Sequence, residues 1–198
     1  LDDGSAMLSA RETSTIIKVN DLESDPTLDY MIGEPSVWAG TDEASSFLTK
    51  SGDFSDTGGQ HSITYVADDS LPDGQYYLYM FDNHFGTSLT RPDFDWTVID
   101  GISTELSSDT AESQYRKYLV DENAGTYTEV SSFDVPYSPY VSSAQELDNG
   151  QILIDSGMKG LFGQYDEDGD LLAQFHMTLN SAYIYRVYKY DFSGFYFA

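Results

Sequence analysis

The residues of this chain best suited to chemistry centre on one histidine, His61, in the stretch Gly59-Gln60-His61-Ser62-Ile63. An imidazole can act as a nucleophile or a proton carrier near neutral pH, because its ordinary pKa lies close to that range. The chain has no cysteine and only two other histidines, His84 and His176. We therefore predict that catalysis, if this protein performs any, runs through His61.

A second candidate is Arg11, one of only four arginines in the chain. It ends a predicted strand at residues 6–10, and we expect it to face the same central region as the loop that carries His61. The planar fork of a guanidinium suits a planar or tetrahedral oxyanion. Taken alone, an arginine at a strand end is more often structural or solvated.

Two further polar clusters leave alternatives open. Asp82-Asn83-His84 follows an aromatic strand predicted at 76–81, and Asn83 and His84 are either substrate-pocket residues or an Asx-type turn with an exposed histidine. The acidic turn at 166–170 is a hairpin turn rather than a calcium loop, because an EF-hand needs a bidentate glutamate where Met177 stands. We interpret His176 as a packing or surface residue, and we predict no metal site.

The composition excludes several classes of partner. The formal net charge is −25, so nucleic acid and anionic membrane surfaces are repelled, and a small anion needs a local cationic pocket. No run approaches the roughly 20 apolar residues needed to cross a bilayer. The absence of cysteine excludes disulfides and thiolate metal sites, and no glycine-rich loop opens a helix to hold a nucleotide phosphate. We predict no cofactor.

Short β-rich runs alternate with Gly, Asp, Asn and Ser turns throughout, which predicts an all-β protein. The clearest unit is residues 141–177, where four short strands joined by tight turns are typical of one blade of a β-propeller. Similar units are predicted at 1–35 and 61–134, with closing strands at 182–197 and an irregular loop at 33–60. We therefore predict that the chain forms about three blades of a β-propeller.

Three blades leave sheet faces and edges open to water, because propellers close with four to eight. The chain begins with Leu1 rather than Met, which indicates a piece of a longer protein. The alternative is that the chain assembles with another molecule, and a homo-oligomer is compatible with the open sheets.

Five stretches resemble, in order along the chain, the bacterial arylsulfate sulfotransferases: residues 9–19 (SARETSTIIKV), 59–62 (GQHS), 81–83 (FDN), 137–139 (YSP) and 185–189 (YRVYK). The resemblance implies a six-bladed propeller that moves a sulfuryl group from an aryl sulfate to a phenol without a nucleotide donor. It implies that His61 is transiently sulfated and that Arg11 grips the sulfate oxygens. It also implies a site position near Ser138-Pro139 where a hydroxyl is expected, and either Val141 or Ser142 falls at that position in this chain.

Two departures from the family pattern stand out. His84 occupies the position after Phe-Asp-Asn where the family usually has glycine, and the family's further site histidines and asparagine would lie upstream of Leu1. The alternative hypothesis is therefore a non-catalytic propeller module or an inactive fragment. The resemblance implies an extracytoplasmic location, since the family includes exported members.

Overall fold

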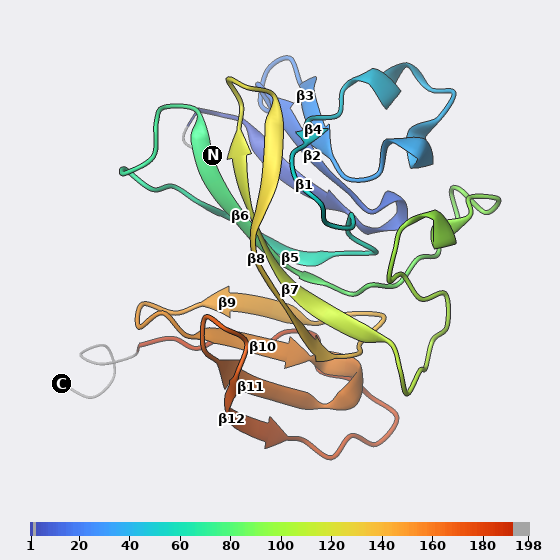
Figure 1. Cartoon of the computed structure of the whole chain (residues 1–198), viewed down its shortest axis with the longest axis vertical. Helices are drawn as coiled ribbons and strands as arrows, with labels where there is room; N and C mark the ends of the chain where they lie inside the picture. The colour runs from blue at the N-terminus through green and yellow to red at the C-terminus, as the bar shows by residue number, and fades with distance from the viewer. Residues whose placement is uncertain (2, 192–198) are drawn as a thin grey trace.

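The computed structural model describes residue 1 and residues 3–191, and these residues form three open β-sheets (Figure 1). The first sheet has the order β1-β2-β3, with strands Ala6–Ala10, Thr15–Asn20 and Thr27–Ile32. The second has the order β4-β8-β7-β6-β5, with strands Thr49–Lys50, Thr126–Pro136, Glu112–Asp121, Gln75–Asp82 and His61–Val66. The third has the order β12-β11-β10-β9, with strands Leu171–His176, Leu161–Tyr165, Ile152–Ser156 and Ser143–Glu146.

Neighbouring strands pair antiparallel except β4, which pairs parallel with β8. The helical segments of the described residues are five short 3₁₀ turns, η1 to η5, at Arg11–Thr13, Pro35–Trp38, Asp42–Ser45, Trp96–Val98 and Gly157–Lys159. The all-β prediction is thus confirmed.

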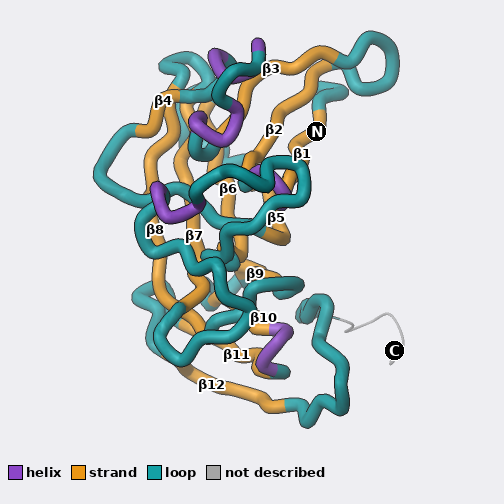
Figure 2. The backbone as a smooth tube through the Cα atoms, turned by 90° about the vertical axis from the view of Figure 1, so that its right-hand side faces the viewer, coloured by secondary structure: helices purple, strands orange, loops and turns teal. Residues whose placement is uncertain are grey.

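The five-stranded sheet lies between the other two (Figures 1 and 2). The side chains of β6 pack against both of these neighbouring sheets. Successive side chains of a strand point to opposite faces. Tyr76, Leu78 and Met80 pack with residues of β2 and β3 in one core, whereas Tyr79 and Phe81 pack with residues of β9, β10 and β11 in a second. Because both faces of β6 are covered, its sequence is one continuous apolar run rather than an alternating one.

Several local predictions are confirmed, among them the hairpin of β7 and β8 and the four-stranded meander formed by β9 to β12. Residues 166–170 form the predicted hairpin turn, in which the Gly169 amide donates to the Asp166 carbonyl. The predicted closing strands at 182–197 differ: residues 182–191 belong to no strand, and the rest lie outside the described residues. In the part of the chain described, no helix is long and apolar enough to span a membrane.

Candidate functional site

His61 is the first residue of β5, directly opposite Phe81 of β6. Its Nδ1 atom lies 2.6 Å from Oδ1 of Asn83 and 3.0 Å from the carbonyl oxygen of Gly59. Asn83 is fully buried at the end of β6, and its Nδ2 donates to the carbonyls of Ser138 (2.6 Å) and Val141 (3.1 Å). The structure therefore brings His61 and Asn83 together and ties both to the loop at 138–142.

These contacts determine which ring nitrogen of His61 carries the proton. Nδ2 of Asn83 faces two carbonyls, which only accept, so the amide is oriented with Oδ1 toward the imidazole. Because Oδ1 also only accepts, Nδ1 of His61 must be the donor. The neutral ring then keeps its lone pair on Nε2, which is the atom available for nucleophilic attack.

Burial of the imidazole lowers the pKa of His61 below its ordinary value, since the charged form loses hydration. The hydrogen bonds to Asn83 and Gly59 oppose this shift, and the positive charges of Arg11 and Arg186 add to it. The net lowering keeps His61 neutral at pH 7. A neutral ring is the form that a nucleophile requires.

The turn that delivers His61 is anchored from two directions. The Gly58 amide donates to Oδ1 of Asp82 at 2.8 Å, and the Gly59 amide donates to the Ser14 hydroxyl at 2.9 Å. Asp82 is fully buried and forms an ion pair with Arg116, whose Nε lies 3.0 Å from Oδ2. The position of His61 thus depends on β6, on β7 and on the segment after η1.

We expect Gly59→Ala to displace this turn. Gly59 has φ +68°, and an added Cβ would lie 2.8 Å from the carbonyl oxygen of Phe85. Gly125→Ala is the matched control, because Gly125 has φ +66° with nothing within 4 Å of its Cβ position. Gly59→Ala should lower the free energy of unfolding by about 1–3 kcal/mol more than Gly125→Ala, measured by urea denaturation. Equal losses would show that only the backbone conformation matters at Gly59.

Arg11 begins η1 and lies beside Gly59, whose Cβ position is 3.5 Å from the arginine Nε. Its guanidinium stacks over the rings of Phe85 and Tyr140, 5.3 and 5.0 Å from their centroids. Nη1 is 3.3 Å from Glu12, whereas the buried Nε and Nη2 have no hydrogen-bond partner in the described structure. Nε and Nη2 form one edge of the fork, so Arg11 has a free bidentate donor edge that is buried, and its positive charge acts on His61.

Several non-glycine residues around this site have strained backbone conformations. Ser62, His84, Val141 and Ser142 all have positive φ, at 57°, 51°, 53° and 89°. Such values are uncommon outside glycine and unfavourable for a β-branched residue like Val141. They persist only where surrounding contacts hold them, as the hydrogen bond from Asn83 does for the carbonyl of Val141.

Ser142 lies in this strained loop with its hydroxyl already engaged. Its Oγ donates to Oγ of Ser138 at 2.9 Å and accepts from the Gly157 amide at 3.1 Å. The described contacts of Ser142 and of the Asn83 amide are therefore to the protein itself. Direct substrate contact by either side chain stays a prediction.

The other two histidines lie in different surroundings. Nε2 of His84 is 2.9 Å from Nη2 of Arg116 and 3.3 Å from Oδ2 of Asp82, so this buried ring joins the ion pair beneath the glycine turn. A substrate-binding role for His84 stays a prediction. His176 is exposed on β12. Among the described residues, no cluster of histidine and carboxylate side chains could hold a metal ion.

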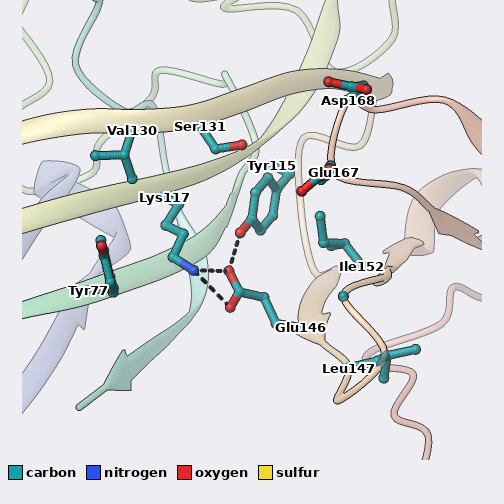
Figure 3. Close-up of a pocket in the computed structure, with 11 residues that line it drawn as sticks. Tyr77, Tyr115, Lys117, Val130, Ser131, Glu146, Leu147, Ile152, Glu167 and Asp168 are labelled. Carbon is teal, nitrogen blue, oxygen red and sulfur yellow. Dashed lines mark hydrogen bonds and ion pairs between the residues drawn. The ribbon is translucent and has the colours of Figure 1, made fainter. Parts of the chain in front are cut away.

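A separate cavity of about 510 Å³ lies between the β7–β8 hairpin and the third sheet (Figure 3). Lys117 Nζ contacts both carboxylate oxygens of Glu146, at 2.9 and 3.0 Å, and the Tyr115 hydroxyl donates to the same carboxylate (Figure 3). Lys117, Glu146 and the Tyr115 hydroxyl therefore meet one another's charges and hydrogen-bonding needs. The cavity therefore offers nothing comparable to the free donor edge of Arg11.

The family model described as Arylsulfotransferase (ASST) matches residues 1–187. The chain belongs to this family. Among curated proteins, no sequence matches the chain. The match supports aryl sulfotransferase activity in general, with aryl sulfates and phenols as the indicated substrates.

In this member of the family, sequence reasoning missed most of the contacts that support the site. The ion pair between Asp82 and Arg116 carries no local motif, and for the loop at 138–142 the sequence indicated a site hydroxyl but not the carbonyls that orient Asn83. Phe85 and Tyr140, which stack on Arg11, look like ordinary apolar residues in the sequence. The local signals were the stretch 137–139 at the start of that loop and Asp82-Asn83, a polar pair at the end of an apolar strand.

Proposed function

We propose that this chain transfers a sulfuryl group from an aryl sulfate to a phenol in two steps, with His61 carrying the group between them. The observation that supports this most directly is the hydrogen bond from Nδ1 of His61 to Asn83, which leaves the Nε2 lone pair free. The free donor edge of Arg11 beside the same ring supports it further.

In the first step, Nε2 of His61 attacks sulfur. The N–S bond forms as the S–O bond to the ring breaks, and the aryl oxide leaves with the electron pair. Nε and Nη2 of Arg11 bind two sulfuryl oxygens and stabilise their charge. Aryl leaving groups suit the reaction because a phenolate is far more stable than an alkoxide.

In the second step, the oxygen of a phenol attacks the sulfur of sulfo-His61. The new S–O bond forms as the N–S bond breaks, its electron pair returns to Nε2, and the phenolic proton passes to water or a base. Asn83 acts throughout as a positioning residue, because its Oδ1 holds the Nδ1 proton and so keeps Nε2 directed at sulfur.

The proposal includes the architecture. The three face-packed sheets are interpreted as successive blades of an incomplete propeller, with blades near 1–35, 61–134 and 141–177. The packing of β6 into two separate cores supports this interpretation, since a blade buries both of its faces.

The experiment is to mix the protein with 4-nitrophenyl sulfate without an acceptor. We expect a burst of 4-nitrophenol equal to the protein concentration, and a mass increase of one SO₃ group on the peptide containing His61. Adding phenol should remove the adduct and restore turnover. Steady turnover with phenol but no burst and no adduct would contradict a covalent intermediate, and inertness toward both compounds would favour a non-catalytic module.

A further inference from the structure

The chain turns back after β12 and passes β10 and β9 on its way to the C-terminal end (Figures 1 and 2). Its backbone is held at every second residue: the Tyr185 carbonyl accepts from the Ser142 amide at 3.2 Å, and both backbone groups of Val187 bond to Oγ of Ser143. The Gln145 side chain bonds likewise to both backbone groups of Lys189. This spacing shows that residues 185–189 run extended along β9.

Because side chains alternate along an extended segment, Arg186 and Tyr188 project from the same side. The Tyr188 hydroxyl lies 3.4 Å from Oγ of Ser62, the residue next to His61. Arg186 therefore leaves the segment on the same side as Tyr188, the side that faces Ser62. Consistent with this placement, the charge of Arg186 contributes to lowering the pKa of His61.

Two of the four arginines are occupied by buried or backbone acceptors within the protein. Arg116 is buried in its ion pair with Asp82, and Arg91 donates to the carbonyls of Val37 and Thr90. Arg186 stacks on the ring of Tyr185 at 5.1 Å and has no carboxylate partner among the described residues. Arg11 and Arg186 thus bring two guanidinium groups toward one imidazole in a protein of net charge −25.

A singly charged aryl sulfate needs only one of these groups, and Arg11, with buried donors, suits the sulfuryl end. Arg186 is exposed, which leaves its guanidinium accessible to the far end of a donor held at His61. A second negative charge on the donor would be repelled by the protein as a whole unless a local cation met it.

We propose that Arg186 is a specificity residue that binds a second anionic group, such as a ring carboxylate, on the aryl sulfate donor. The inference rests on the proposed function. The contact stays partly hydrated, so it changes donor preference by a modest factor.

The test compares 3- and 4-carboxyphenyl sulfate with 4-nitrophenyl sulfate as donors. Arg186→Gln should lower kcat/KM for the better carboxylated donor by about five- to tenfold and change that for 4-nitrophenyl sulfate by less than about twofold. Arg186→Lys should recover part of the loss. Lys189→Gln is the matched control, because it removes one positive charge from the same segment and should leave both values unchanged.

Equal losses for all donors would overturn the proposal, because Arg186 would then act on the shared sulfuryl group or leaving oxygen. Unchanged values for all donors would overturn it as well. If the wild-type chain transfers a sulfuryl group from none of the donors, the proposed function fails. The role of Arg186 is then tested by measuring donor binding instead of turnover. Calorimetry in the His61→Asn background should then show that Arg186→Gln weakens the binding of carboxylated donors about five- to tenfold. The binding of 4-nitrophenyl sulfate should not change.

Discussion

His61→Asn is expected to abolish transfer from 4-nitrophenyl sulfate to phenol, with a loss of about four orders of magnitude or more in kcat/KM. Asparagine carries an amide nitrogen where histidine has Nδ1, so it can still donate to Asn83. It has no atom equivalent to Nε2. The variant therefore removes the nucleophile while preserving the hydrogen bond that anchors this end of β5.

The matched control is His176→Asn, the same chemical change at an exposed position on β12. It should leave the transfer rate unchanged. Urea denaturation should give both variants a free energy of unfolding close to that of the wild type. A folded His61→Asn protein with near-normal turnover would sink the assignment of His61 as the sulfuryl carrier.

Arg116→Met is expected to give the largest loss of stability, about 3–5 kcal/mol in the free energy of unfolding. The substitution leaves the carboxylate of Asp82 fully buried without its ion-pair partner, and its remaining polar contacts are the amides of Gly58 and His84 and the ring of His84. Because the same carboxylate anchors the glycine turn before His61, the variant should also lose activity under conditions where it is still folded.

Lys117→Met, at the next position of β7, is the control. Its ion pair with Glu146 is about one quarter exposed on both sides, at 22% and 26%, and exposed pairs contribute about 1 kcal/mol or less. Adding Asp82→Asn to Arg116→Met should recover part of the loss, since it removes the uncompensated charge. Similar losses for Arg116→Met and Lys117→Met would contradict a structural role for the buried pair.

The proposed function requires a chain of net charge −25 to bind anionic sulfate esters. The glycine turn, η1 and the segment after β12 bring Arg11 and Arg186 to the same imidazole. Two local cations can outweigh a repulsive surface charge at short range, because charges on the solvated surface are screened beyond roughly 10 Å.

The sequence by itself determined the class of fold and pointed to His61, the residue that we propose as the centre of the site. Strand 6–10 and the hairpin of β7 and β8 follow from β-rich runs separated by Gly, Asp and Asn turns, which are local properties. His61 was singled out because the chain offers few other groups that can act as nucleophiles near neutral pH. The five stretches in order also identified the family.

Only the tertiary structure decided how that residue is held. Asn83 lies 22 positions after His61, and the carbonyls that orient Asn83 lie 55 and 58 positions further on. Strand patterns show which residues face a core, but not which side chain stands opposite which across a sheet or between sheets. For the same reason the sequence did not decide whether His84 is a pocket residue or part of an exposed turn. The pairing of β6 with β7 places its ring beside Arg116.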